Sequence, residues 1–549
     1  MKNLGFCEDM THEFKSDRSK LPDNEIIDAV VAFANTDGGD LYIGVEDNGD
    51  ISGIHSAHTD ITQLAAFIAN KTVPPVAVRV EFLEPDLPVI KIQVPRMTTV
   101  VSSSAGKIQR RRIKTDGTPE NIPMYPYEIS TRLSSLRLFD YSAQPVPDGD
   151  YNDLDTVERE RLRNIIRSYR GEATLLELTD EELDKALHLA IEQNGKLVPT
   201  FCGLLLIGRK EKLKQYMPTA ESTIQVLSGT DVFVNDSFFL PILAAFEKIN
   251  TVFTAWNREE ELDIGLFRYA IPDYDPRAFR EALVNAFSHR DYSTLGRVRI
   301  QITDEGMSIT NPGGFIEGIH IDHLIDAEPH GRNPVLSDAL KRIGLAERTG
   351  RGIDRIFEGS LLYGRMLPDY SQSTSSSVKL FIPKGPTDKS FIQMISQEHQ
   401  RTGKSLPVYA LLIMHSLKRL HKATVAEISE DANTDESRTR VLLEMLVESG
   451  ITEAGGVGRG RYYMLGRKYY QSKNDLISYT RQIDIDPIRY EELVLQLAKQ
   501  QGHVKRADVI ELLHITSSQA YRVLHRLAGL GKLIPSGKGA GAKYLYNKK

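Results

Sequence analysis

Residues 276–290, PRAFREALVNAFSHR, predict an amphipathic helix that carries a polar stripe. Asp275 suits the N-cap and Pro276 suits the first turn. Apolar side chains share one face of this helix: Phe279, Leu283, Ala286 and Phe287. An acid, an amide and an imidazole share another face: Glu281, Asn285 and His289. Such a stripe is typical of a solvated surface or of a helix that faces a ligand.

The residues that follow favour the ligand-facing helix. Arg297–Ile302 (RVRIQI) alternates as a strand, a turn follows at 304–306, and Met307–Thr310 predicts the returning strand. Two glycine-rich loops come next, NPGG at 311–314 and RTGRGI at 348–353. Exposed N–H groups in such loops can cradle phosphates. One loop alone is weak evidence. The order of features predicts a nucleotide site, because a Glu-x-x-x-Asn helix is followed by a hairpin and then by two glycine loops.

These blocks resemble the GHKL ATPase fold with its Bergerat-type nucleotide site, and especially the divergent subgroup found behind Schlafen-type AlbA domains. The blocks are EALVNAFSHRDY (281–292), ITNPGGFIEG (309–318), RNP (332–334) and GLAERTGRGIDRI (344–356). The resemblance implies that ATP binds with Mg²⁺, that Asn285 coordinates the metal and that Glu281 activates the attacking water. It implies further cofactor contacts from the stripe and the two loops: His289, Asn311, Gly313, Gly314, Gly350, Arg351 and Gly352.

One position departs from that family. Members usually have an aspartate that binds the adenine amino group, and this chain has Asn311 there. An asparagine carbonyl still accepts a hydrogen bond from an amino group, but it is uncharged. We therefore expect weaker adenine selectivity, with slow hydrolysis or with binding that lacks turnover.

The N-terminal segment places carboxylates near a predicted hairpin tip. We expect a helix over 22–36, a strand over Asp40–Val45 and a type I′ turn at Asn48-Gly49. Three carboxylates and a cation are candidates for one site: Glu8, Glu13, Asp47 and Lys15. Hard oxygen ligands of this kind bind Mg²⁺ or Mn²⁺, and such sites hydrolyse phosphodiesters. A solvated acidic surface is the alternative.

The same segment resembles the Schlafen-type AlbA domain. HEFK (12–15), AFANTDGGDLYIGV (32–45), EDNG (46–49) and ISGI (51–54) carry the resemblance. In nuclease members an acidic triad cuts RNA, and it maps here to Glu8, Glu13 and Asp47 with Lys15 beside them. Other members bind nucleic acid without shown cleavage. A strand within 101–122 would supply cations for that role: Arg110, Arg111 and Arg112.

The C-terminal part of the chain repeats one pattern, three short helices and then a glycine-rich hairpin. The first copy has predicted helices over 407–420, 424–431 and 434–450 and a hairpin over 455–465. The second has predicted helices over 489–501, 506–513 and 517–530 and a hairpin tip at 536–541. This order predicts two winged helix-turn-helix units.

Charge distinguishes the two copies. The chain has a net charge of −6, but residues 488–549 hold eleven Lys/Arg against four Asp/Glu, a local charge of +7. We therefore expect the second copy to bind duplex DNA. Its third helix and wing supply the expected contacts: Ser517, Gln519, Arg522, Arg526, Lys538 and Lys543. The first copy is more acidic and offers Arg438 and Arg440, so it suits either DNA or protein contacts.

Composition predicts a multidomain α+β protein. The 549 residues, 41% of them apolar and 26% charged, exclude wholesale disorder. Apolar runs are far shorter than the roughly 18–20 residues of a membrane span, and no signal peptide is recognised. We expect a cytoplasmic chain with no membrane partner and no disulfide framework. The predicted parts are an AlbA domain (1–140), a linker (140–153), a GHKL-like α/β sandwich (150–385) and winged helices (390–470 and 485–549).

Three functions fit this plan. The leading one is an ATP-binding, DNA-binding transcription regulator whose nucleotide state controls the winged-helix contacts. The alternative is an ATP-gated nuclease of RNA or DNA, in antiphage defence, with Mn²⁺ or Mg²⁺ held by Glu8, Glu13 and Asp47. The third is a structural homo-oligomer joined by its winged helices. Metal-dependent cleavage distinguishes the second, and sequence-selective duplex binding separates the first from the third.

Overall fold

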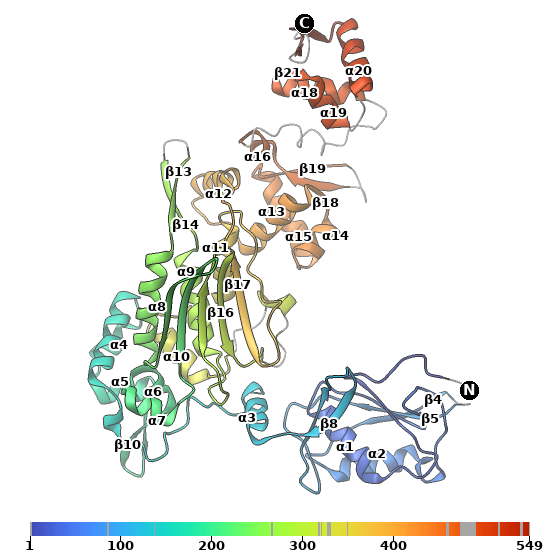
Figure 1. Cartoon of the computed structure of the whole chain (residues 1–549), viewed down its shortest axis with the longest axis vertical. Helices are drawn as coiled ribbons and strands as arrows, with labels where there is room; N and C mark the ends of the chain where they lie inside the picture. The colour runs from blue at the N-terminus through green and yellow to red at the C-terminus, as the bar shows by residue number, and fades with distance from the viewer. Residues whose placement is uncertain are drawn as a thin grey trace.

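The computed structural model describes residues 3–84, 87–136, 138–264, 267–316, 319, 321–326, 331–347, 350–456, 461–472, 490–513, 517–537 and 542–547. Buried apolar residues gather in four main clusters, and the regions built on them follow one another along the chain (Figure 1). The clusters run over 21–101, 146–382, 361–470 and 494–544, and we call the regions built on them the N-terminal, central, first C-terminal and second C-terminal units. The predicted mixed α+β, multidomain class is confirmed. None of the helices in these ranges is long and apolar enough to cross a membrane.

The N-terminal unit is a four-stranded sheet packed against two helices. Strand order is β1-β2-β5-β4, with β1 parallel to β2 and the other pairs antiparallel. The helix and strand expected over 22–36 and 40–45 are present, and α1 buries Ile26, Val30 and Phe33. The elements are β1 (His12–Lys15), α1 (Asp23–Ala34), β2 (Gly39–Ile43), α2 (Ile61–Lys71), β3 (Thr72–Val73), β4 (Arg79–Glu84), β5 (Leu87–Val94), β6 (Ser102–Ser103), β7 (Gln109–Ile113), β8 (Pro119–Pro123) and α3 (Pro126–Ser135).

The turn at residues 46–50 differs from the predicted type I′ turn. The amide of Glu46 donates to the carbonyl of Asp50 at 2.9 Å, and the amide of Gly49 donates to the carbonyl of Glu46 at 2.8 Å. Gly49 has φ +83°, whereas Asn48 keeps a negative φ. The loop therefore has three residues and ends in a left-handed glycine, the other common hairpin geometry. The Asn3 amide, which donates to the Asn48 carbonyl at 3.0 Å, helps to hold it.

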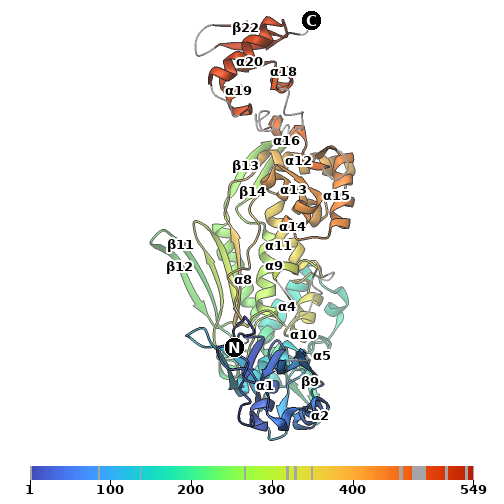
Figure 2. The same ribbon diagram turned by 90° about the vertical axis from the view of Figure 1, so that its right-hand side faces the viewer.

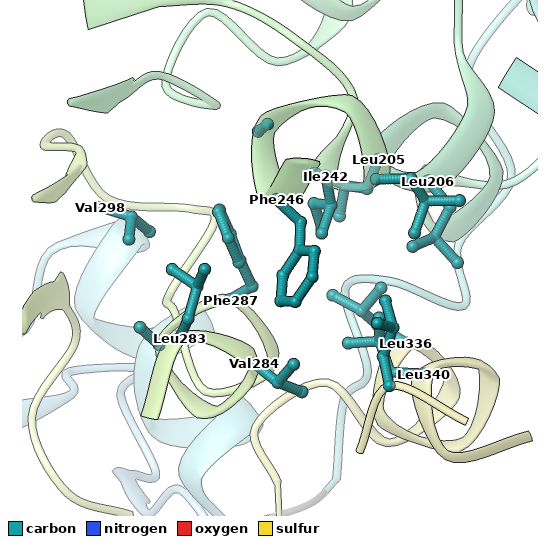
Figure 3. Packing of buried hydrophobic residues seen from close by; sticks show 14 of the residues in the cluster. Leu205, Leu206, Ile242, Phe246, Leu283, Val284, Phe287, Val298, Leu336 and Leu340 are labelled. Atoms are coloured by element: carbon teal, nitrogen blue, oxygen red, sulfur yellow. The ribbon is translucent and has the colours of Figure 1, made fainter. Parts of the chain in front are cut away.

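The central unit is a five-stranded sheet with helices α8 to α11 on one side (Figure 2). Its order is β12-β11-β15-β16-β17, and only β11 and β15 run parallel. Leu283 and Phe287 of α9 pack with Phe246 of α8 and with Leu336 and Leu340 of α10 (Figure 3). The helices are α4 (Thr156–Ser168), α5 (Asp180–Ala186), α6 (Phe201–Ile207), α7 (Lys210–Tyr216), α8 (Ile242–Trp256), α9 (Pro276–Ser288), α10 (Pro334–Arg342) and α11 (Gly352–Leu361). The strands are β9 (Ala190–Gln193), β10 (Lys196–Pro199), β11 (Ser222–Ser228), β12 (Asp231–Phe238), β13 (Glu259–Ile264), β14 (Phe267–Pro272), β15 (Val298–Ile302), β16 (Gly306–Pro312) and β17 (Ser377–Pro383).

Residues 140–153, which the sequence predicts as a linker, pack on the central unit instead. The Asp140 carboxylate accepts from the amide of Val335 at 2.9 Å, and the Ser142 hydroxyl accepts from the amide of Leu336 at 3.2 Å. Val146 is buried in the core of the unit. Asn333, the residue before α10, makes no side-chain cap. The side chains of Asp140 and Ser142 therefore satisfy amides in the first turn of that helix instead.

The two C-terminal units each contain three helices and a three-stranded sheet. Their sheets have the same plan, β18-β20-β19 in the first and β21-β23-β22 in the second. The first also includes an unpredicted helix, α12 (Lys389–Thr402), and α16 (Arg467–Ser472). Its other elements are α13 (Val408–Leu420), β18 (Lys422–Thr424), α14 (Val425–Asp431), α15 (Glu436–Glu448), β19 (Thr452–Gly455) and β20 (Tyr462–Leu465). The second has α18 (Tyr490–Gln501), β21 (His503–Lys505), α19 (Arg506–Leu513), α20 (Ser517–Gly529), β22 (Leu533–Ser536) and β23 (Lys543–Tyr546).

Candidate nucleotide and nucleic-acid sites

A cavity of about 170 Å³ in the central unit lies against the polar stripe of α9. Asp275 caps the helix by accepting from the amides of Arg277 and Ala278 at 2.8 and 3.0 Å. The apolar face of α9 is buried in the core, so the opposite stripe meets the cavity. Most of the predicted nucleotide residues line it: Glu281, Asn285, His289, Asn311, Gly314, Gly350 and Gly352.

Two glycines, Gly350 and Gly352, lie where the second loop meets α9. A Cβ on Gly352 would lie 3.2 Å from Glu281 Oε2 and 3.8 Å from Asn285 Nδ2. Gly350 has φ +79°, which favours glycine. α11 begins at Gly352, so its first backbone amides lie beside the stripe. This placement gives the cavity backbone donors of the kind that bind phosphate oxygens.

The two titratable side chains of the stripe have shifted pKa values. Burial raises the pKa of Glu281, which suits a carboxylate that accepts a proton from water. Burial, together with the charges of Arg332 and Lys341, lowers the pKa of His289 to about 4. His289 is therefore neutral at pH 7, so it can hydrogen-bond to a ligand but does not supply a positive charge.

The structure does not place Arg351, the expected phosphate contact, in the cavity wall. Arg351 is exposed and is absent from the residues that line the cavity. Lys341, on α10, is the one Lys or Arg among the described lining residues. Lys341 and Ser337 are four residues apart on that helix, a spacing that could have identified both from the sequence.

Asn311 lies on β16 and is buried at the cavity wall. Its Nδ2 donates to the carbonyl of Pro312 at 3.3 Å. This bond leaves Oδ1 as the acceptor, the role that the resemblance implies toward an amino group.

The remaining predicted loop residue, Gly313, lies behind the wall. It has φ +92°, and a Cβ there would meet the Asp291 side chain at 2.8 Å and Arg332 Nε at 3.3 Å. Arg332 donates to the carbonyl of Gly314 at 3.0 Å. Arg332, which belongs to the RNP block at 332–334, is therefore a buried support of the first glycine loop.

The cavity also contacts the first C-terminal unit. Ile325 lines the cavity and packs against the apolar core of that unit. The next residue, Asp326, pairs with Arg438 of α15 at 3.1 Å and accepts from the Tyr409 hydroxyl. The Arg438 guanidinium lies 4.4 Å from the centroid of the Tyr409 ring. Arg438, near the start of α15, was expected to contact DNA or protein. In the structure its guanidinium is bound by Asp326 and Tyr409 of the same chain.

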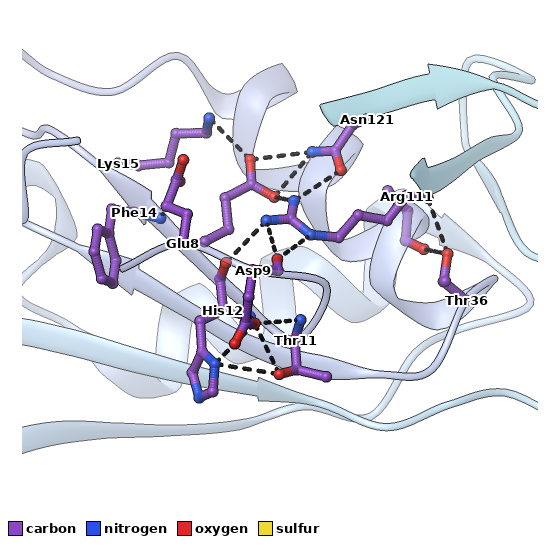
Figure 4. A network of polar contacts seen from close by, with 11 residues as sticks. Glu8, Asp9, Thr11, His12, Phe14, Lys15, Thr36, Arg111 and Asn121 are labelled. Atoms are coloured by element: carbon purple, nitrogen blue, oxygen red, sulfur yellow. Dashed lines mark hydrogen bonds and ion pairs between the residues drawn. The ribbon is translucent and has the colours of Figure 1, made fainter. Parts of the chain in front are cut away.

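In the N-terminal unit Lys15, Arg111 and Asn121 belong to one polar network (Figure 4), and all three bind the buried carboxylate of Glu13. Its carboxylate pairs with Arg111 at 2.5 Å and Lys15 at 2.8 Å and accepts from the Asn121 amide at 2.9 Å. Arg111 also donates to the carbonyls of Asp9 and His12. Both oxygens of Glu13 are thus occupied by protein donors.

The three carboxylates of the predicted triad do not assemble into a metal site. Burial raises the pKa of Glu8, which lies near Glu13 and accepts from the amide of Phe14 at 2.7 Å. Asp47 is exposed on the hairpin tip. In the part of the chain that the structure describes, no group of three His, Cys, Asp or Glu side chains is placed to hold a metal ion. Phosphodiester cleavage stays a prediction.

The three consecutive arginines do not share one role. Successive side chains of β7 point to opposite faces, as in any strand. Arg110 and Arg112 reach outward and pair with Glu128 and Glu120, whereas Arg111 is 3% exposed. The expectation that all three contact nucleic acid is therefore wrong for Arg111, because its donors are used inside the unit.

The second C-terminal unit presents its predicted contact residues on the surface of α20 and β23. Ser517, Arg522, Arg526 and Lys543 are exposed. Arg526 pairs with Glu491 of α18 at 3.0 Å. Lys538 and the side chain of Gln519 lie outside the described residues.

Family models match three parts of the chain. Residues 8–119 match the family described as "Schlafen, AlbA_2". Residues 296–382 match the family described as "Putative ATP-dependent DNA helicase recG C-terminal". Residues 133–223 match "Domain of unknown function (DUF8451)". No curated protein matches the chain.

Solved structures extend the comparison of folds. The DIP2311 protein from Corynebacterium diphtheriae is 18% identical, with a TM-score of 0.51 over 85% of this chain and 94% of that one. A MarR family transcriptional regulator from Silicibacter pomeroyi is 21% identical over 20% of this chain and 78% of its own, with a TM-score of 0.12. The DIP2311 match shows a shared fold over most of the chain. Within that fold, residues 8–119 form an AlbA_2 domain of the Schlafen type, and residues 296–382 belong to a domain related to the recG C-terminal family.

Proposed function

We propose that this chain is an ATP-binding, DNA-binding regulator in which the nucleotide in the α9 cavity controls how the first C-terminal unit is held. The observation that carries the proposal is the segment 324–326. Leu324 and Ile325 line the cavity, and Asp326 binds Arg438 of the first C-terminal unit at 3.1 Å. A ligand that moves this segment must also change that contact.

α11 supports the same coupling by a second route. It starts at Gly352 beside Glu281 and Asn285, and its last residue, Leu361, is buried in the core of the first C-terminal unit. Ile356, one and a half turns earlier, belongs to the core of the central unit. A short rigid helix that is packed in two cores transmits displacement better than a loop, because packed interiors deform little.

The residues of the cavity fit a nucleotide with Mg²⁺. Asn285 offers one carbonyl oxygen, and Mg²⁺ in such sites is completed by phosphate oxygens and water. Lys341 would offset part of the phosphate charge, which matters because Glu281 and Glu347 also line the cavity. When bound, the metal would neutralise charge on the phosphates, while Glu281 would accept a proton from the attacking water.

Replacing Asn285 tests nucleotide binding directly. We expect the wild type to bind ATP with Mg²⁺, and Asn285→Ala to weaken binding at least about tenfold, or about 1.4 kcal/mol, because a metal ligand is lost. Arg351→Ala is the control, since Arg351 is exposed outside the cavity wall, and its affinity should stay near that of the wild type. Isothermal calorimetry measures both. A folded wild type that binds no ATP would refute the proposal.

Removing the Asp326 carboxylate tests the coupling. In the wild type, ATP with Mg²⁺ should change duplex-DNA affinity by about fivefold or more, within the usual range of allosteric coupling. Asp326→Ala should reduce that change while ATP still binds, because the link to Arg438 is lost and only the route through α11 remains. Glu436→Ala removes a carboxylate at the start of the same helix, where it faces Arg440 and not Asp326, and it should leave the ATP effect intact. An unchanged ATP effect in Asp326→Ala would contradict this route.

A further inference from the structure

Helix α3 joins the N-terminal unit to the central unit (Figure 1). Toward the N-terminal unit, Arg132 of α3 donates to the carbonyl of Met97 at 2.8 Å. Glu128 of the same helix accepts from Arg110 Nε of β7 at 2.8 Å. These contacts tie α3 to the strand that also carries Arg111, the buried partner of Glu13.

The opposite side of α3 contacts the central unit through hydroxyl groups. The Thr131 hydroxyl donates to Asp291 Oδ2 at 2.8 Å. The Ser135 hydroxyl accepts from Arg332 Nη1 at 3.0 Å, and the Ser134 hydroxyl donates to the Arg332 carbonyl at 3.3 Å. Arg332 is 2% exposed, so its guanidinium depends on protein acceptors such as the Ser135 hydroxyl rather than on water.

The same two residues of the central unit hold the first glycine loop. Arg332 Nη2 donates to the carbonyl of Gly314, a cavity residue, at 3.0 Å. The amide of Asp291 donates to the carbonyl of Pro312 at 2.9 Å. Gly313 packs directly on both side chains and leaves no room for a Cβ. The loop and α3 therefore share Arg332 and Asp291 as common supports.

We infer that Arg332 is a positioning residue that links the first glycine loop to α3, so that nucleotide binding in the cavity is transmitted to the N-terminal unit. The inference rests on the proposed nucleotide binding and goes beyond it, because the proposed coupling runs to the first C-terminal unit. Its physical basis is continuity: Gly314, Arg332, α3 and β7 are joined by a chain of hydrogen bonds. A ligand that orders the loop lowers the frequency with which these bonds open.

Hydrogen exchange of the full chain tests the inference without a nucleic-acid ligand. Exchange is followed by mass spectrometry with and without saturating ATP and Mg²⁺. In the wild type we expect ATP to slow amide exchange at 309–316, and also at 97–101 and 126–136. The exchange rate should fall by about tenfold or more at amides whose exchange requires an opening that releases ATP. The double variant Thr131→Val/Ser135→Ala keeps Arg332 and its bond to Gly314 but removes the two hydroxyls of α3 that bind the Asp291 carboxylate and the Arg332 guanidinium. It should keep the protection at 309–316 and lose it at 97–101.

Ser130→Ala is the matched control. Its hydroxyl bonds within α3, to the carbonyl of Pro126 at 3.2 Å, so its removal should leave the ATP response of the N-terminal unit unchanged. Circular dichroism establishes that each variant is folded, and the single Ser135→Ala variant replaces the double one if the latter unfolds. Wild type that binds ATP by calorimetry but shows no change at 97–101 overturns the inference and leaves the proposed function standing. Protection that persists in the double variant also overturns it. Absence of ATP binding refutes the proposed function itself.

Discussion

Glu13→Ala should destabilise the N-terminal unit by about 3–5 kcal/mol, the usual effect of removing one member of a buried ion pair. The substitution leaves Arg111, which is 3% exposed, with an uncompensated charge in the interior. It also removes the acceptor of Lys15 and of the Asn121 amide. Glu13→Gln keeps an acceptor oxygen and the side-chain volume, so it should cost less than Glu13→Ala.

Native-state hydrogen exchange at the amides of α1 is the suitable measurement. The chain has a single tryptophan, Trp256 in the central unit, so tryptophan fluorescence does not report on the N-terminal unit. Asp47→Ala is the control, because this carboxylate is exposed on the hairpin tip and its loss should change exchange little. Equal protection of α1 in Glu13→Ala and wild type would contradict the role assigned to the network.

This result bears on how the nuclease alternative is tested. Loss of cleavage in Glu13→Ala would follow from loss of structure alone, so that variant cannot identify a cutting site. Asp47→Ala removes a predicted triad member with little structural consequence. Metal-dependent cleavage of RNA or DNA that Asp47→Ala abolishes would support the triad, and cleavage that survives it would exclude Asp47.

Deletion of residues 488–549 should abolish binding of duplex DNA at physiological salt. The segment carries a charge of +7 on a chain of net −6, and its cations on α20 and β23 are exposed. In electrostatic binding of this kind, the logarithm of the binding constant falls linearly with the logarithm of the salt concentration. The slope is about −0.9 for each phosphate that the protein neutralises. A truncated chain that binds DNA as tightly as the full chain would contradict the assignment.

Single substitutions sharpen the same test. Arg522→Ala on α20 should weaken DNA binding and reduce the salt slope by about one. Lys499→Ala removes the same charge from an exposed position on α18, and it should have a smaller effect if α20 is the contacting helix. Fluorescence anisotropy over a series of salt concentrations measures both slopes. Equal losses in the two variants would indicate a diffuse charge effect rather than contacts by α20.

Local signals in the sequence predicted the elements well. The N-cap at Asp275, the apolar spacing of Phe279, Leu283 and Phe287, and the alternation of β15 predicted the helix and strand that frame the cavity. The three-helix order of both C-terminal units was predicted in the same way. These signals depend on neighbours within about one helical turn or two strand positions, so they are contained in short stretches.

The outward or inward direction of a side chain was less well predicted, although the rule for it is local. Arg110, Arg111 and Arg112 were grouped by residue type, but strand alternation buries the middle one. Arg351 was placed near the phosphates by resemblance, whereas the structure shows it exposed at the start of α11 and not among the residues that line the cavity.

The sequence by itself determined the four-part plan, the polar stripe of α9, the order of the two glycine loops and the basic C-terminal end. Only the tertiary structure decided which distant residues share a site. Glu13 meets Arg111, Thr131 meets Asp291, and Asp326 meets Arg438, each pair separated by 98 or more positions. No periodicity or cap encodes such pairs, because they form when whole units pack and buried charges must find acceptors within the interior.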